Sequence, residues 1–187
     1  METTIINLFG APGSGKSTCA AHVFASLREQ GVAAEFVPEY AKELVWFGNK
    51  AELADQLSIF AEQHRRIIRV FGKVAYILTD GPLLNSILFQ PEGYPELFTE
   101  TVLAFHARFP RQKNYLLKRT HSYEKAGRQQ TEEEAVLLGH KLEGILHRHI
   151  PGQVTTLPVG QAVSAIMADL LAEREAEKAL SALGQCA

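Results

Sequence analysis

The sequence has 187 residues, a length that fits one compact domain better than two. Hydrophobic residues make up 46% and charged residues 21%, which excludes a disordered, collagen-like or disulfide-scaffold chain. The formal net charge of −2 excludes a globally basic nucleic-acid-binding protein but not a local basic patch. We therefore expect a single domain over residues 1–187.

The cysteines and the apolar runs indicate a cellular location. Cys19 lies just after a glycine-rich segment and Cys186 is next to last, so we expect no structural disulfide and a reducing, cytoplasmic compartment. No run of 18 apolar residues occurs, and Met1 is followed by a strand-like run without a basic leader. The sequence therefore predicts neither a membrane span nor an export signal.

Short apolar runs alternate with segments of helical periodicity along the whole chain. In chain order we expect a strand at 5–9, a helix at 16–28, a strand at 33–37, helices at 40–47 and 53–70, a strand at 74–79, a helix at 95–109, a strand at 114–117, a helix at 131–147, a strand at 154–157 and a helix at 161–183. Thr131 and the three glutamates after it form a capping-box pattern. The alternation predicts an α/β fold, with a parallel sheet covered on both faces and ligands at the carboxyl ends of its strands.

A glycine-rich loop follows the first expected strand and opens the first expected helix. It consists of Gly10, Ala11, Pro12, Gly13, Ser14, Gly15, Lys16, Ser17 and Thr18, and it matches the phosphate-binding pattern of two spaced glycines followed by lysine and a hydroxyl residue. Glycine lets backbone amides close around phosphate oxygens, and the helix directs its positive end at the same anion. Lys16 would contact the β- and γ-phosphates and Ser17 would hold Mg²⁺. The loop therefore predicts binding of a nucleoside triphosphate.

The lack of a guanine-binding motif indicates which nucleoside triphosphate the loop binds. A GTPase would carry an Asn-Lys-x-Asp motif late in the sequence, whereas the segment 49–52 (NKAE) comes early and lacks the aspartate. We therefore expect ATP.

Two acids follow expected strands at the edge of the sheet where the loop lies. Asp80 ends the 74–79 strand, where a carboxylate can reach Mg²⁺ or take a proton from an attacking hydroxyl. Glu39 ends the neighbouring strand and is a second candidate base. Their structural alternatives are a turn-forming aspartate before Gly-Pro and a helix-start acid interacting with the helix dipole. The sequence leaves open which of the two is the base.

A long basic and polar connection, about 119–131, joins an expected strand to an expected helix. Long connections of this kind often form lids. Arg119 and Arg128 would then close on the triphosphate and stabilise charge on the transferred phosphoryl group, although a solvated loop is the simpler alternative. Glu132, Glu133 and Glu134 are expected to be helix-opening charges.

Several other residues carry two interpretations each. The amides of Gln56 and Gln63, with His64, either read a base or ribose or form a plain surface face. Trp46 and Phe47 are expected in the core, with base stacking as the alternative. Two basic clusters are either solvated helix edges or a patch that binds the phosphates of a nucleic acid. The first consists of Arg65, Arg66 and Arg69, and the second of Arg108, Arg111 and Lys113. His140, His147 and His149 follow no zinc spacing, so no structural metal is expected.

Together these motifs resemble a known family. The segments GAPGSGKST, PEYAKELV, DQLSIFAEQHRRI, ILTDGPLL and LLKRTHSYEKAGRQQTEEEA look like P-loop kinases that include the nicotinamide riboside kinase domain of the NAD-biosynthesis regulator and many small bacteriophage (deoxy)nucleoside or DNA kinases. The resemblance covers most of residues 4–158.

The resemblance implies a nucleoside-kinase-like fold with a five-stranded parallel sheet. It implies that Lys16 and Ser17 bind triphosphate and metal, that Glu39 and Asp80 flank the acceptor hydroxyl, and that Arg128 belongs to the lid; Tyr40 and Gln63 are expected to contact the acceptor as well. Where nicotinamide riboside kinases have two acids before the acceptor site, this sequence has Leu78 and then Asp80. A bacteriophage origin would place the protein in the host cytoplasm.

We therefore predict an ATP- and Mg²⁺-dependent kinase that phosphorylates a hydroxyl of a nucleoside-type or nucleotide-type acceptor, with Lys16, Glu39, Asp80 and Arg128 as the catalytic residues. One alternative is a bacteriophage-type kinase that phosphorylates 5-hydroxymethyluracil within DNA, which the basic clusters would support. Another is a regulatory P-loop ATPase in which hydrolysis drives partner binding. The sequence leaves the oligomeric state open, and the expected helix 161–183 packs either on the domain or on a second copy.

Overall fold

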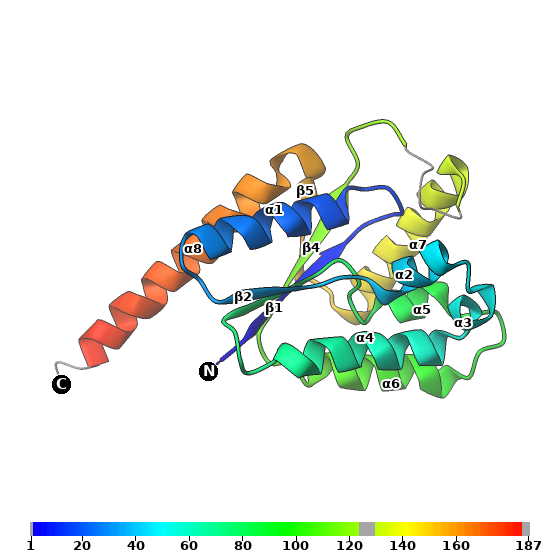
Figure 1. The fold of residues 1–187 in the computed structure, drawn as a ribbon, viewed down its shortest axis with the longest axis horizontal. Coiled ribbons are helices and arrows are strands. Elements are labelled where there is room, and N and C mark those ends of the chain that lie inside the picture. The colour runs from blue at the N-terminus through cyan, green and yellow to red at the C-terminus, as the bar shows by residue number, and fades with distance from the viewer. Residues whose placement is uncertain (1, 124–129, 185–187) are drawn as a thin grey trace.

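A computed structural model describes residues 2–123 and 130–184 and shows a five-stranded sheet flanked by helices (Figure 1). The elements are β1 (Thr4–Phe9), α1 (Lys16–Glu29), β2 (Ala34–Val37), α2 (Tyr40–Phe47), α3 (Lys50–Ala54), α4 (Gln56–Val70), β3 (Tyr76–Thr79), α5 (Asn85–Phe89), α6 (Glu96–Ala107), β4 (Gln112–Lys118), α7 (Glu132–His149), β5 (Val154–Pro158) and α8 (Val159–Gly184). The expected α/β fold is confirmed.

All strands run parallel, in the order β2-β3-β1-β4-β5. The register pairs Val37 with Thr79 and Asn7 with the same Thr79, so the ends of β1, β2 and β3 lie close together. The loop after β1, Glu39 after β2 and Asp80 after β3 therefore meet at one edge of the sheet. This is the edge where parallel α/β sheets bind ligands.

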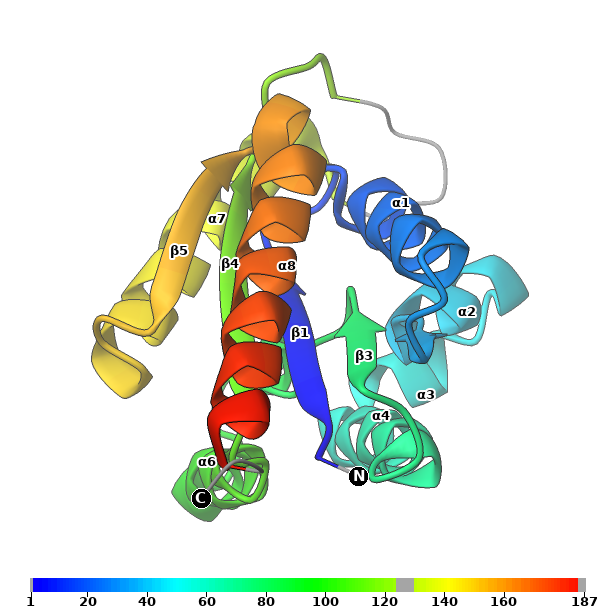
Figure 2. The ribbon, with the colours of Figure 1, turned by 90° about the vertical axis from the view of Figure 1, so that its left-hand side faces the viewer.

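Two hydrophobic layers hold the helices on the sheet. On one face, α1 and α8 pack on Ile6 and Leu8 of β1. The packing residues are Cys19, Ala20, Val23 and Leu27 of α1 and Ala162, Ile166, Met167 and Leu170 of α8. On the other face Ile5 and Phe9 contact residues of α4, α5, α6 and α7. Figure 2 shows α1 and α8 on the same side of the strands. The alternation of β1 residues between the layers is the period of a strand buried on both faces.

The prediction of one continuous helix at 53–70 is wrong, because the structure divides this region between α3 and α4. The Asp55 carboxylate accepts hydrogen bonds from the backbone N–H groups of Leu57 (3.1 Å) and Ser58 (3.2 Å) and caps the second helix. The short helix α5 was not expected from the sequence. The capping box at the start of α7 is confirmed, since Thr131 and Glu134 bond each other's backbone N–H groups.

The first half of α8 packs against α1 and the sheet, and its second half extends away from the sheet (Figure 1). Packing on the domain, one of the two expectations for this helix, is therefore confirmed for its first half. Within the described residues, each helix is too short or too polar to cross a bilayer. Cys19 is a free, buried thiol, and burial raises its pKa to about 11, which keeps it protonated and unreactive. Cys186 lies outside the described residues.

Candidate active site

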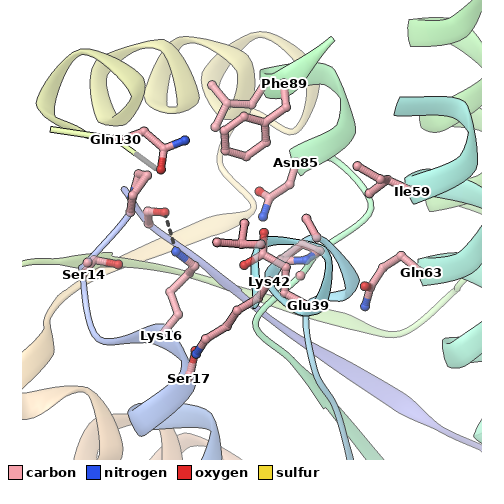
Figure 3. Close-up of a pocket in the computed structure, with 18 of the residues that line it drawn as sticks. Ser14, Lys16, Ser17, Glu39, Lys42, Ile59, Gln63, Asn85, Phe89 and Gln130 are labelled. Atoms are coloured by element: carbon pink, nitrogen blue, oxygen red, sulfur yellow. Dashed lines mark hydrogen bonds between the residues drawn. The ribbon is translucent and has the colours of Figure 1, made fainter. Parts of the chain in front are cut away.

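The glycine-rich loop forms one wall of a cavity of about 430 Å³ at the carboxyl edge of the sheet (Figure 3). Gly10, Pro12, Ser14, Lys16 and Ser17 contribute to this wall. The volume lies within the range of small-molecule sites. The structure thus gathers the expected phosphate-binding residues around an open space.

Two loop glycines leave no room for a side chain. A Cβ at Gly10 would lie 2.3 Å from Ser14 Oγ and 2.9 Å from the Leu117 carbonyl oxygen, and one at Gly15 would lie 2.8 Å from Val159 Cγ2. Gly15 also has φ +86°, in the left-handed region that favours glycine. The backbone therefore turns tightly into α1, and the first residues of that helix, Lys16, Ser17 and Thr18, line the cavity.

The Lys16 ammonium donates hydrogen bonds to the carbonyl oxygens of Gly10 (2.9 Å) and Ala11 (3.2 Å). Its side chain therefore lies across the loop, where Figure 3 shows it. Ser17 presents its hydroxyl to the same space and accepts a hydrogen bond from the Lys42 ammonium at 3.3 Å. The hydroxyl that is expected to bind Mg²⁺ is thus bonded to a cationic side chain. Its oxygen is of the ligand type that Mg²⁺ prefers.

Glu39 and Asp80 occupy different environments. Glu39 is half-buried and lines the cavity, and burial raises the pKa of its carboxyl group; Asp80 raises it too, while Lys16 and Lys42 lower it. Asp80 is 2% exposed, lies beneath the cavity lining and accepts a hydrogen bond from the Glu39 backbone N–H at 2.8 Å. The carboxylate that faces the open space is therefore Glu39, and Asp80 fixes the turn that carries it.

The turn that carries Glu39 is held at two further points. The Gln63 amide oxygen accepts from the Tyr40 backbone N–H (2.9 Å), and its NH₂ group donates to the carbonyl oxygen of Pro38 and the hydroxyl of Thr79, each at 3.3 Å. Gly81 permits the close approach, because a Cβ there would lie 2.8 Å from Glu39 Cα. Gln63 lines the cavity, as expected for an acceptor-binding residue, but its amide is already bonded to the protein.

Tyr40 is placed outside the cavity lining. Its hydroxyl donates to Glu52 and its ring lies under the Arg66 guanidinium, 4.6 Å from the ring centroid. It therefore connects α2 to α3 and α4. The expectation that Tyr40 contacts the acceptor finds no support in this geometry.

The wall opposite the phosphate loop combines apolar and amide side chains. The apolar surface comes from Val45, Trp46, Leu53, Ile59, Leu88 and Phe89, and the polar groups come from Gln56, Asn85 and Ser86. Asn85 Oδ1 is buried without a hydrogen-bond partner among the described residues. Such a compartment suits a flat, mostly apolar group with a few polar atoms at its edge.

Two expectations for this wall are wrong. Trp46 is 68% and Phe47 81% exposed, so neither belongs to the core; α2 is a short helix that buries only Leu44. Gln56 and Gln63 are 6% and 4% exposed and do not form a surface face. The alternatives, a stacking role for Trp46 and a polar role for the amides, therefore remain as predictions.

The connection after β4 is described only in part, and Arg128 lies outside the described residues. Arg119 forms an ion pair with Glu132 (2.6 Å) and lies over the Tyr123 ring at 5.1 Å, with Nη1 buried and without a partner among the described residues. Arg119 directly follows β4 and is thus at the carboxyl edge of the sheet. Its role at the triphosphate stays a prediction, as does that of Arg128.

Four of the six cations in the two basic clusters form ion pairs with carboxylates. Arg65 and Arg66 pair with Glu62, and Arg66 also forms a double contact with Glu43. The second cluster lies at the opposite edge of the sheet from the phosphate loop, since Arg111 and Lys113 flank the start of β4 and the loop follows the end of β1.

Carboxylates on α8 neutralise this second cluster. Arg111 pairs with Glu2, Glu173 and Glu177, and Lys113 pairs with Asp169 and Glu173. Arg108 lies over the Phe105 ring. The paired charges attract an external polyanion less than free charges would, so the clusters lose their value as support for a DNA acceptor.

Several lining residues were not predicted from the sequence, among them three with polar or charged side chains. Lys42, Asn85 and Gln130 all face the cavity (Figure 3). Lys42 stands in the segment PEYAKELV, from which Glu39 and Tyr40 were expected at the site. Its position three residues after Glu39, in the first turn of a helix, is the signal that was available. Asn85 belongs to α5, which the sequence did not reveal. Among the described residues no cluster of three or more His, Cys, Asp or Glu side chains forms a metal site.

A family model described as an AAA domain matches residues 5–162. The chain belongs to this AAA domain family. The matched part of the AAA domain runs from β1 to the start of α8 and so contains the loop, both acids and the cavity lining. A search of the curated proteins finds no match.

Solved kinase structures share the fold of this AAA domain. The deoxyadenosine kinase from M. mycoides, with the products dCMP and dCDP bound, is 18% identical, with a TM-score of 0.57 over 90% of this chain and 99% of the kinase. The thymidylate kinase from Ehrlichia chaffeensis is 12% identical, with a TM-score of 0.65 over 91% of this chain and 100% of the kinase. The AAA domain therefore has the P-loop fold of nucleoside and nucleotide kinases, and the expected fold class is confirmed.

Proposed function

We propose that this chain is an ATP-dependent kinase that transfers the γ-phosphoryl group to a hydroxyl of a nucleoside-type or nucleotide-type acceptor. One observation carries the proposal: the phosphate loop and the Glu39 carboxylate line the same cavity from different elements, β1–α1 and the turn after β2. A phosphoryl donor and a hydroxyl acceptor would therefore meet between them. The resemblance to nicotinamide riboside kinases and bacteriophage kinases, and the kinases that share the fold, support the same reaction class.

In this mechanism the loop amides bind the phosphates of ATP, and Lys16 moves from the carbonyl oxygens of the loop to the β- and γ-phosphates. Ser17 is the residue of the loop that would hold Mg²⁺, which supplies charge neutralisation on the phosphates when it is bound. Asp80 was expected to share that task. Its burial under Glu39 favours a positioning role through the Glu39 backbone instead.

Glu39 takes the proton of the acceptor hydroxyl. The acceptor oxygen forms a bond to the γ-phosphorus while the bond from that phosphorus to the β–γ bridging oxygen breaks, and ADP leaves with the electron pair. Burial raises the pKa of Glu39, which makes its carboxylate a better proton acceptor than an exposed one. Arg119, and Arg128 from the expected lid, would add positive charge at the phosphates.

The apolar and amide wall would hold the base of the acceptor, with Trp46, Ile59 and Phe89 against its faces and Gln56 and Asn85 at its edge. The kinases that share the fold are compatible with a nucleoside and with a nucleotide as the acceptor, since one is named for a nucleoside and the other for a nucleotide.

The experiment incubates the protein with γ-labelled ATP and a panel of nucleosides, nucleotides, hydroxymethylated DNA and plain DNA. Label transferred to a nucleoside or nucleotide, and lost in Lys16→Ala, is the expected result. Label that appears only in DNA would favour the DNA-kinase alternative. ATP hydrolysis at the same rate with and without every acceptor would contradict the proposal and favour a regulatory ATPase.

A further inference from the structure

Lys42 is a cation of the acceptor-side helix α2 that reaches across to the phosphate loop. Its ammonium donates to Ser17 Oγ at 3.3 Å, and Figure 3 shows the extended side chain ending beside Ser17. Ala41, Lys42, Val45 and Trp46 form the cavity face of α2. Lys42 therefore links the wall that carries the acceptor compartment to the wall that carries the phosphate loop.

The position of Lys42 on its helix is electrostatically unfavourable. It lies in the first turn of α2, which begins at Tyr40, and the partial positive charge of a helix N-terminus repels a cation. Among the described residues no carboxylate forms an ion pair with Lys42, whereas Glu43, the next residue, pairs with Arg66. The charge of Lys42 acts on the Glu39 carboxyl, whose pKa it lowers, without forming an ion pair with it. The ammonium is therefore suited to contact an anion that enters the cavity from outside.

The Ser17 hydroxyl cannot serve Lys42 and a metal ion together. Mg²⁺ would bind the same oxygen that accepts the Lys42 hydrogen bond, and two cations within a few ångströms repel each other. Lys42 is exposed on a flexible stem, so it is free to turn aside. The group that arrives with Mg²⁺ and carries the nearest negative charge is the terminal phosphate of ATP.

We propose that Lys42, which donates a hydrogen bond to the Ser17 hydroxyl, is a further nucleotide-contacting residue and binds the γ-phosphate of Mg²⁺-ATP. The inference rests on the proposed binding of ATP to the loop but not on the identity of the acceptor. It assigns to α2 a lysine that distinguishes ATP from ADP, because ADP has no γ-phosphate. Lys42 would also carry charge on the phosphoryl group as it moves to the acceptor.

The test measures dissociation constants for ATP and ADP, each with Mg²⁺ and each with EDTA, by calorimetry without any acceptor. Lys42→Gln is expected to weaken Mg²⁺-ATP binding about tenfold and to leave ADP binding within twofold. Lys42→Arg keeps the charge and should restore most of the ATP affinity. Lys50→Gln is the matched control, since Lys50 also lies in the first turn of an exposed helix, α3, but outside the cavity lining.

Equal effects of Lys42→Gln on ATP and ADP, or no effect on either, would overturn the assignment. In an acceptor-dependent assay, the same variant should lower kcat about 10²-fold with little change in the KM of the acceptor. An unchanged kcat would also count against it. If no acceptor is phosphorylated by the wild-type protein, the kinase proposal fails, and the comparison of ATP with ADP still decides the role of Lys42.

Discussion

Burial separates two carboxylates that stand after neighbouring strands. Asp80 is enclosed and bonded to the Glu39 backbone, while Glu39 keeps its carboxylate toward the cavity. Burial raises the pKa of Glu39 and so its affinity for a proton, while Lys16 and Lys42 oppose this shift and favour the ionised form that can accept a proton from a hydroxyl. The geometry thus favours Glu39 over Asp80 as the proposed base, a choice that the sequence left open.

Substitutions at the two acids should have distinct effects. Glu39→Gln removes the proposed base and should lower kcat by about 10²–10⁴-fold, with ATP affinity nearly unchanged. Asp80→Asn keeps an oxygen that can accept from the Glu39 N–H, so it should lose less activity than Asp80→Ala. Steady-state kinetics at several Mg²⁺ concentrations give the measurement. If Asp80→Asn instead raised the Mg²⁺ requirement strongly, Asp80 would be a metal-binding residue.

Trp46 offers a direct probe of the acceptor compartment. It is the single tryptophan of the chain, is 68% exposed and lines the cavity. A base that stacks on it should quench or shift its fluorescence in a saturable way, and Trp46→Leu should raise the KM of the acceptor more than that of ATP. Fluorescence that responds to ATP but to no acceptor that the protein phosphorylates would place the base elsewhere.

At the scale of elements, the turns after β2 and β3 fit together because residue 81 has no side chain. A Cβ at Gly81 would lie 2.8 Å from Glu39 Cα, 3.0 Å from Glu39 Cβ and 3.2 Å from Gln63 Cδ. Backbone contacts of this kind yield only by moving a turn. The position of the proposed base therefore depends on the packing of two loops as well as on its own hydrogen bonds.

Gly81→Ala should displace the Glu39 turn, lower kcat at least tenfold and reduce the free energy of unfolding by about 1–3 kcal/mol. Gly144→Ala is the control, because Gly144 lies within α7 with nothing near its Cβ position, and alanine in a helix should be neutral or stabilising by about 0.5–1 kcal/mol. Urea denaturation and kinetics on both variants test the difference. Normal activity in Gly81→Ala would show that the turn tolerates the extra carbon.

The elements that the sequence predicted well have local signals. The phosphate loop, α2 and the capping box of α7 are each encoded by residues adjacent in the chain. The break at Asp55 was missed because hydrophobic periodicity continues across it, and α5 was missed because five residues hold little more than one helical turn.

Long-range contacts account for most of what the sequence did not show at the site. The far wall of the cavity combines residues from α2, α4 and α5, and only packing decides that Gln63 bonds the turn after β2 while Asn85 faces the open space. The exposure of Trp46 likewise follows from α2 packing through Leu44 alone. Residue type indicated the chemistry of these side chains but not the direction in which they point.

At the scale of the whole molecule, charge balance is built from specific ion pairs. Arg111 contacts acids near the N-terminus and on α8, and so connects Glu2 with Glu173 and Glu177. Exposed pairs of this kind contribute little individually. They do place acids beside Arg111 and Lys113, which lowers the attraction of these two cations for a polyanion such as DNA.

A buried histidine, His106, and a half-buried one, His64, make the stability of the whole molecule depend on pH. His106 in α6 is 7% exposed, and burial lowers its pKa to about 4. His64 in α4 contacts the Phe60, Phe105 and Phe109 rings; burial lowers its pKa and the Arg108 charge lowers it further. Both side chains therefore stay neutral in the folded protein at pH values where an unfolded chain would protonate them.

The free energy of unfolding should fall as the pH is lowered from about 6.5 toward 4, because the unfolded state then binds protons that the folded state does not. For His106 the difference between the folded pKa of about 4 and the ordinary value near 6.5 corresponds to roughly 3 kcal/mol at its maximum. His106→Gln should flatten this dependence, and His22→Gln, at an exposed position of α1, should leave it unchanged. Urea denaturation at half-unit pH steps between 7 and 4.5 separates this effect from that of the carboxylates, whose titration begins lower. An unchanged slope in His106→Gln would mean that His106 is protonated in the folded protein.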